Sequence, residues 1–173
     1  IPLDNRKVIC FSPKGIKIDQ NYIINLTNYE NIVLICGHYE GIDQRVIDTL
    51  VDDVVSLGDF VLTGGEIPAM ALIDATVRHI DGVIKKESIR EESFTNGLLE
   101  HRQWTRPSLY RGLEVPDVLL SGHHENIRKF KLEDAVRETL IFRKDLLSEN
   151  SFDCEIENII KKIIKEKENE FTR

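Results

Sequence analysis

The sequence predicts an α/β protein with a mostly parallel sheet, followed by a small helical region. Two short apolar segments rich in β-branched residues, 7–11 and 32–36, are typical of strands covered on both faces. Helix-like segments at 19–28 and 42–50 follow them in alternation. Strand–helix alternation of this kind favours a parallel sheet with helices packed on it.

A third apolar segment, 59–63, predicts a further strand that ends at Gly64 and Gly65. Pro68 stands in the first turn of the next helix, where a missing backbone N–H costs nothing. Apolar residues continue that helix through Ile80.

Residues 81–100 separate this region from a second one. Asp81 and Gly82 end the helix, and the charged stretch that follows has no clean period, as in an exposed linker. Helices are expected near 125–130, over 132–147 and over 155–167. We therefore expect an α/β domain at 1–81, a linker at 82–100 and a helical domain at 101–173.

Composition describes a globular protein of 173 residues with a net charge of −7. No apolar run approaches the roughly 20 residues that span a bilayer. Cys10, Cys36 and Cys154 lack the spacing of a disulfide framework or a zinc site and fit a reducing, cytoplasmic environment. The chain starts at Ile1, almost directly before a strand, so we expect an N-terminal portion to be missing.

The charge is unevenly distributed. Residues 1–100 carry −7, residues 101–144 carry +3 and residues 145–173 carry −3. The middle block is where a nucleic-acid phosphate backbone would be attracted. Ordinary solvated helix faces give the same pattern, and charge alone does not choose between the two interpretations.

Three glycine-containing loops are predicted at the carboxyl ends of the strands: 12–15, 37–41 and 56–65. Ligands of open α/β sheets bind at this edge, and glycines let the backbone approach a flat ligand closely. The chain has neither G-x-G-x-x-G nor G-x-x-x-x-G-K-[ST], which disfavours a dinucleotide or P-loop enzyme. The loops indicate a nucleoside-like ligand.

Several longer motifs resemble one enzyme family. They are Ile35–Val46 (ICGHYEGIDQRV), Ser56–Met70 (SLGDFVLTGGEIPAM), Gly97–Glu100, Thr105–Pro107 and Val115–His124. In this order, and over nearly the whole chain, they resemble the bacterial tRNA (guanine-N1)-methyltransferases of the SPOUT superfamily. The resemblance implies an α/β fold with a deep trefoil knot, S-adenosylmethionine as methyl donor, tRNA as substrate, and a cytoplasmic homodimer with its active site at the subunit interface. The implied product is 1-methylguanosine immediately 3′ of the anticodon.

The resemblance also assigns the residues that contact S-adenosylmethionine. They fall on the three glycine-containing loops and the start of the following helix: Ser12, Pro13, Gly37, Tyr39, Glu40, Ser56, Leu57, Gly58, Asp59, Phe60, Val61, Leu62, Gly64, Gly65 and Pro68.

Two further residues carry the chemistry that the resemblance implies. Guanine N1 holds a proton at neutral pH, so methylation needs a base, and charge that builds up on O6 needs a cation. The family places an Asp and an Arg in these roles. Arg78 matches the Arg, whereas Glu92 stands at the Asp position in a segment about one residue shorter than the family pattern.

Alternatives remain open at the level of the sequence. A related enzyme that methylates a ribose 2′-OH and a non-catalytic RNA-binding relative, suggested by Glu92 at the Asp position, are the rival hypotheses. Trp104, between Arg102 and Arg106, suits either stacking on a base or packing in a core. His123, His124 and Glu125 lack a further spaced ligand, so no metal site is predicted.

Overall fold

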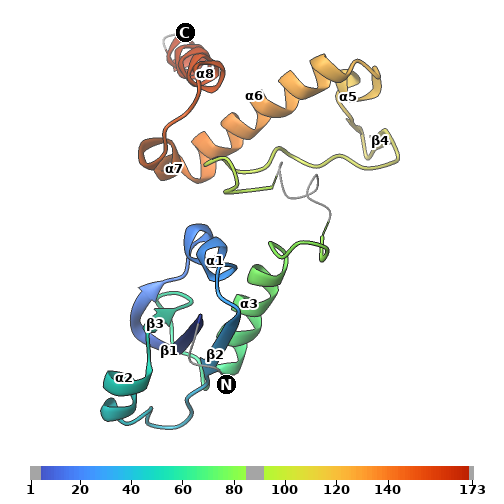
Figure 1. Cartoon of the computed structure of the whole chain (residues 1–173). Helices are drawn as coiled ribbons and strands as arrows, with labels where there is room; N and C mark the ends of the chain where they lie inside the picture. The colour runs from blue at the N-terminus through green and yellow to red at the C-terminus, as the bar shows by residue number, and fades with distance from the viewer. Residues whose placement is uncertain (1–4, 85–91, 172–173) are drawn as a thin grey trace. The chain divides into compact units, whose positions relative to one another are not determined.

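The computed structural model describes residues 5–84 and 92–171. The chain divides into two compact units, residues 1–89 and 90–173 (Figure 1). The division falls within the predicted linker. Residues 85–91, which include Glu91 and most of the charged linker stretch, lie outside the described residues.

The first unit is built on a parallel sheet of three described strands, in the order β2-β1-β3. The long strand β1 (Arg6–Lys17) lies between β2 (Asn31–Ile35) and β3 (Asp53–Ser56). Both neighbours run parallel to β1, which faces β2 with Val8 opposite Val33 and β3 with Cys10 opposite Val54. The predicted α/β class with a parallel sheet is confirmed.

Three helices complete the unit: α1 (Gln20–Leu26), α2 (Gln44–Leu50) and α3 (Glu66–Val77). The Asp19 and Asp43 side chains accept hydrogen bonds from the first turns of α1 and α2, which satisfies backbone N–H groups that the helix cannot pair. Helices α1 and α3 contact each other, and α2 lies apart from them (Figure 1). The core joins two sheet residues to residues of α1 and α3: Ile9, Val55, Ile23, Leu26 and Leu72.

The third strand differs from the prediction. Residues 59–63 lie in a loop, and β3 is formed by Asp53–Ser56 instead. Asp53 is tolerated in the strand because its carboxylate pairs with Lys7 at 2.9 Å and accepts a hydrogen bond from the Tyr22 hydroxyl at 3.0 Å. The apolar run that suggested a strand is exposed at Phe60 and Val61.

The first predicted loop also differs. Strand β1 does not end before Ser12 but continues to Lys17. Its pairing with β3 is interrupted between Phe11 and Ile16, both of which face Val55. The segment 12–15 is therefore a bulge within one strand, and such bulges re-aim side chains next to functional sites.

The second unit is mainly helical. It contains α5 (Asp117–Leu120), α6 (His124–Phe142), α7 (Lys144–Glu149) and α8 (Cys154–Phe171). Helix α6 contacts the other three (Figure 1). The core of the second unit is centred on Leu98, Val136 and Ile163, with partly buried aliphatic residues of α6 and α8 around them.

Helix boundaries in this unit correct the prediction in two places. A single helix, α6, replaces the first predicted segment and most of the second, because no Gly or Pro interrupts it near Lys131 and the backbone leaves the helix only at Arg143. A short hairpin of β4 (Leu109–Tyr110) and β5 (Leu113–Glu114) was not predicted. Its two turn residues, Arg111 and Gly112, both have positive φ angles, as tight hairpin turns require.

Candidate functional site

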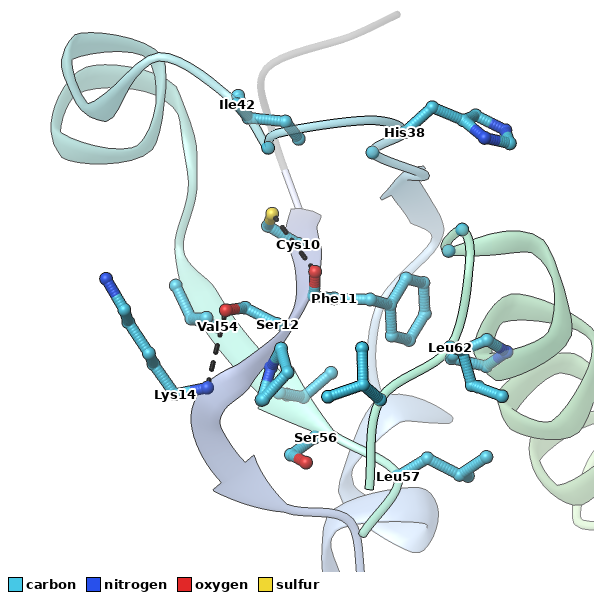
Figure 2. A pocket seen from close by; sticks show the side chains of 18 of the residues that line it. Cys10, Phe11, Ser12, Lys14, His38, Ile42, Val54, Ser56, Leu57 and Leu62 are labelled. Atoms are coloured by element: carbon cyan, nitrogen blue, oxygen red, sulfur yellow. Dashed lines mark hydrogen bonds between the residues drawn. The ribbon is translucent and has the colours of Figure 1, made fainter. Parts of the chain in front are cut away.

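A cavity of about 530 Å³ lies in the first unit, at the carboxyl ends of its parallel strands. Its walls come from the second half of β1, the loop after β2 and the loop between β3 and α3. Phe11 and Ser12 project from β1, His38 and Ile42 come from one loop, and Ser56 and Leu57 start the other (Figure 2). The volume is within the roughly 300–1,000 Å³ of small-molecule sites.

All but one of the predicted cofactor residues line this one cavity. Those brought together are Ser12, Pro13, Gly37, Tyr39, Glu40, Ser56, Leu57, Gly58, Phe60, Val61, Leu62, Gly64, Gly65 and Pro68. Asp59 is not among the lining residues: its exposed carboxylate pairs with Lys17 at 2.5 Å. The bulged segment of β1 and the two glycine-containing loops, which are separate in the sequence, therefore form a single concave surface.

The loop after β2 is tied directly to the start of α3. The backbone N–H of Gly65 donates to the carbonyl of Gly37 at 3.1 Å, and His38 forms an isolated bridge with Gly64. The His38 Nε2 atom also hydrogen-bonds to a carboxylate oxygen of Glu66. These contacts hold two walls of the cavity against each other.

Glu66 is itself held in place electrostatically. A hydrogen bond from its own backbone N–H and the His38 hydrogen bond together lower the pKa of the Glu66 carboxyl. A carboxylate in the first turn of a helix is also favoured by the helix dipole. The side chain therefore serves as an anionic anchor for His38 at the rim of the cavity.

Ser56 fixes the turn that begins the third wall. Its hydroxyl donates to the carbonyl of Gly58 at 3.0 Å and accepts from the Gly58 backbone N–H at 3.2 Å. The Phe60 N–H then donates to the same Gly58 carbonyl at 2.9 Å. Leu57 and Leu62, in the same loop, are among the residues that line the cavity (Figure 2).

Two glycines are required by close backbone approach. A Cβ on Gly65 would lie 2.6 Å from the Cα of Cys36, and one on Gly15 would lie 2.5 Å from the backbone of Val55. A Cβ on Gly58 would instead meet the Phe60 ring at 2.6 Å, and a side chain can rotate where backbone cannot. Gly65 thus shapes the fold around the cavity, whereas Gly58 shapes the cavity surface.

The two cysteines near the cavity are poor candidates for nucleophiles. Burial, and then the neighbouring Cys36, raises the pKa of the Cys10 thiol, and burial followed by the Glu66 charge raises that of Cys36. The thiolate is the reactive form. Both residues therefore favour the inert thiol.

The two predicted catalytic residues lie in different units. Arg78 is the C-terminal cap of α3 in the first unit, and Glu92 is the first described residue of the second. Neither is among the residues that line the cavity. Their roles in catalysis stay predictions.

Sequence reasoning missed several lining residues. They are Cys10, Phe11, Lys14, His38, Gly41, Ile42, Gln44, Ile47, Val54, Val55 and Thr63. His38, Gly41, Ile42, Gln44 and Thr63 lie inside the two long motifs, and Lys14 lies inside the segment 12–15, so taking these segments whole would have found them. Cys10, Phe11, Val54 and Val55 directly precede predicted residues. Ile47 lies in the helix-like segment 42–50, which was not predicted to contact the ligand, and it lines the cavity as a residue of α2.

Within residues 5–84 and 92–171, no group of three or more His, Cys, Asp or Glu side chains is arranged to hold a metal ion. His123 and His124 are both exposed, at the start of α6. In the same part of the chain, no helix is both long enough and apolar enough to cross a membrane.

Fold and cavity define the class: an α/β protein whose ligand cavity lies at the carboxyl edge of a parallel sheet, where such proteins bind their ligands. The family itself follows from a match over most of the chain. Residues 1–149 match the model of the family described as tRNA (guanine-1)-methyltransferase TrmD. The chain belongs to this family, and the resemblance found in its motifs is confirmed.

Individual relatives agree with the family. A Streptococcus uberis protein named tRNA (guanine-N(1)-)-methyltransferase is 50% identical over 167 residues, which cover 96% of this chain and 70% of that protein. Proteins of the same name from Streptococcus suis and Pelotomaculum thermopropionicum are 54% and 48% identical and cover 91% of this chain. The chain spans 65% and 63% of these two relatives, about two thirds of their length.

Proposed function

We propose that this chain is a tRNA (guanine-N1)-methyltransferase that transfers a methyl group from S-adenosylmethionine to N1 of the guanosine immediately 3′ of the anticodon. One observation carries the proposal. Fourteen residues that the family resemblance assigns to the methyl donor, from three separate segments, line one cavity at the ligand-binding edge of the sheet. Family membership supplies the reaction type.

The cavity suits an adenosine-containing methyl donor. Leu57, Leu62 and Ile42 offer apolar surface for a flat ring, and the backbone at Gly37 and Gly64 lines the same cavity. A Cβ on Gly37 would meet the Ile42 side chain at 3.2 Å, so side chains there would fill the space. Bound S-adenosylmethionine supplies an electrophilic methyl group on its sulfonium sulfur.

Glu92 and Arg78 are proposed to carry the proton and the charge. The carboxylate of Glu92 would remove the N1 proton of guanine, and the N1 electron pair would form the new N–CH₃ bond while the S–CH₃ bond breaks and S-adenosylhomocysteine leaves. Negative charge that moves to O6 is stabilised by the Arg78 guanidinium. Glutamate reaches about one methylene further than aspartate, which compensates for the shorter segment around Glu92.

The first unit is proposed to contain the trefoil knot of its family. Two contacts support it: the backbone of Gly65 lies against that of Cys36, and His38 forms a bridge with Gly64. Both bring the loop after β2 and the segment before α3 into close contact, although they are distant in the sequence. An experimental structure in which the chain path through these loops is unknotted would contradict the proposal.

The chain is proposed to form a homodimer with a shared active site, and the exposed apolar face of α3 supports this proposal. Ile67, Met70 and Ile73 follow helical spacing and are exposed, while Ala69 and Leu72 bury the opposite face. A helix that is apolar all round is normally covered on all sides, and a second copy is the proposed cover. Sedimentation velocity should give a dimer for the wild type and a monomer for Met70→Glu.

The helical region at 101–173, which makes up most of the second unit, is proposed to bind tRNA, with residues 82–100 as the linker before it. Support comes from the +3 charge of residues 101–144 in a chain of net charge −7. The reaction is proposed to take place in the cytoplasm.

The base is tested by single-turnover methyl transfer on saturating tRNA, which separates chemistry from product release. Glu92→Gln keeps size and hydrogen bonding but not basicity, so the rate should fall by about 10²-fold or more. Glu92→Asp is the matched control and should keep substantial activity, whereas Arg78→Ala should slow transfer with cofactor affinity unchanged. A Glu92→Gln rate within a few-fold of wild type would remove Glu92 from this role.

The non-catalytic alternative is decided by the same assay. A chain that binds S-adenosylmethionine and tRNA transcripts but transfers no methyl group would be an RNA-binding relative rather than an enzyme.

A further inference from the structure

The second unit has a cavity of its own, about 380 Å³ in volume. It lies between the segment 101–108, α5 and α6. Val115, Leu119 and Ile127 give it an apolar floor, and Arg106 and Lys131 add positive charge. None of the described residues that line it is acidic.

Arg102 lines this cavity but is already neutralised within the protein. Its Nε atom and its backbone N–H donate to the carboxylate of Asp134 at 3.0 and 2.8 Å. Asp134 is only 3% exposed. Burial alone would raise the pKa of Asp134, but the hydrogen bonds from Arg102 outweigh it and hold the pKa below its ordinary value.

The guanidinium of Arg102 lies 6.0 Å from the ring centroid of Trp104, within the range of a cation–π contact. Because Asp134 fixes Arg102, Arg102 in turn restrains the indole ring. Trp104 nevertheless remains 37% exposed. An aromatic face is thus held in place at the cavity and still open to a ligand.

Arg106 differs from Arg102 in its surroundings. Its guanidinium makes no hydrogen bond or ion pair with any other residue in 5–84 or 92–171, and it lines the same cavity as Trp104. The restrained ring of Trp104 suits the base of a nucleotide, and the guanidinium of Arg106 suits its phosphate. Unstacked RNA bases stack on aromatic side chains, and phosphates pair with arginine.

We propose that this cavity binds one nucleotide unit of single-stranded RNA, with the base against Trp104 and the phosphate on Arg106. Arg102 is a positioning residue that orients the ring through Asp134. The site deepens the proposed function and rests on it only for the identity of the RNA as tRNA. The +3 charge of residues 101–144 favours the same ligand.

Trp104 is the single tryptophan of the chain, so its fluorescence reports on this cavity directly. Titration of the full chain with a short oligouridylate should quench the emission saturably. An RNA duplex of the same length should quench it much less, because its bases stay stacked. Binding of oligouridylate, seen by anisotropy of a labelled strand, with no change in Trp104 emission would overturn the site.

Arg111 supplies the matched control for Arg106. It lies on the β4–β5 hairpin with its guanidinium 5.3 Å from the Tyr110 ring, and it does not line the cavity. Arg106→Ala should weaken oligouridylate binding about tenfold and reduce the slope of log K against log[salt] by about 0.7. Arg111→Ala should change affinity by less than about twofold. Equal losses in the two variants would show diffuse attraction and overturn the site.

The aromatic half of the site has its own variants. Trp104→Ala should weaken binding by about fivefold or more, since a stacked base contributes about 1–3 kcal/mol. Trp104→Phe keeps an aromatic face and should retain most of the affinity, which separates stacking from a packing defect. Loss of affinity in both variants, with folding intact, would count against stacking.

The site and the proposed activity fail in different ways. Saturable quenching and a selective Arg106 effect in a chain that transfers no methyl group would support the site and refute the activity. Methyl transfer to tRNA with Arg106→Ala and Arg111→Ala indistinguishable would do the reverse.

Discussion

The cavities of the two units have comparable volumes, about 530 and 380 Å³, but different walls. The first is built largely from glycine backbone and apolar side chains, with turns that satisfy their own hydrogen bonds, as at Ser56 and Gly58. The second is built from long side chains, among them Arg106 and Lys131, around a tryptophan.

The difference separates two ways of recognising a ligand. A backbone-built cavity selects by shape, so added side-chain atoms should damage it and salt should matter little. A cavity built from cationic side chains selects by charge and stacking, so truncations and salt should act there. Variants placed in one cavity should leave ligand binding at the other unchanged.

The largest expected effect is at the glycines of the first cavity. Gly58→Val should abolish detectable S-adenosylmethionine binding in a folded protein, because the added side chain displaces Phe60 at the cavity surface. Gly65→Val should, in contrast, unfold the first unit, because its Cβ meets the Cys36 backbone. Calorimetry and urea unfolding measure the two effects, with Arg106→Ala as the binding control. Near-normal cofactor affinity in Gly58→Val would show that the first cavity does not select its ligand by shape.

The next effect is on stability in the second unit. Arg102→Ala leaves the buried Asp134 carboxylate without its cation and should lower the free energy of unfolding by about 3 kcal/mol. Urea unfolding followed by Trp104 fluorescence measures it. Arg111→Ala, on the exposed hairpin, should change stability by less than about 0.5 kcal/mol. A loss no larger than that control would show that the ion pair contributes nothing.

This ion pair also predicts a pH dependence. The pKa of Asp134 is lowered in the folded state, so its contribution is fully present above the unfolded value of about 3.9. It is lost as the pH falls through the lowered folded value. The stability gap between wild type and Arg102→Ala should therefore shrink under acid, and a gap that widens there would contradict the assignment.

The smallest effect is at the rim of the first cavity. His38→Ala frees the loop after β2 from Glu66 and should weaken cofactor binding by about fivefold, the magnitude of one lost hydrogen bond. Glu66→Gln should do the same, and the double variant should lose no more than either one. Calorimetry decides between this and additive losses, which would show that the two side chains act separately.

The sequence was informative where a residue pattern has one structural meaning. Alternating strands and helices predicted the parallel sheet, and the glycine motifs predicted which segments meet, because the carboxyl ends of parallel strands share one edge. Fourteen of the assigned residues line that edge. Asp59 was assigned because it stands inside the motif, but its side chain turns outward to Lys17.

Prediction failed where one pattern has two meanings. Phe60, Val61 and Leu62 form an apolar run that suits a strand or a ligand-lining loop, and only the pairing of Asp53 with Ile9 shows which segment is the strand. The local sequence does not distinguish Arg102 from Arg106, since both stand two positions from Trp104. They differ because Arg102 contacts Asp134, which is 32 positions away in the chain. Such distinctions depend on tertiary contacts that no local pattern records.

Methyl transfer to N1 of guanine in tRNA is decided by the identity of the methylated nucleoside. The chain is incubated with isotopically methyl-labelled S-adenosylmethionine and an unmodified tRNA transcript, which is then digested to nucleosides and analysed by mass spectrometry. A transcript with adenosine in place of the guanosine 3′ of the anticodon is the control. Labelled 1-methylguanosine is expected from the first transcript and none from the second. Label on a ribose, label that persists in the control, or bound cofactor with no labelled nucleoside would contradict it.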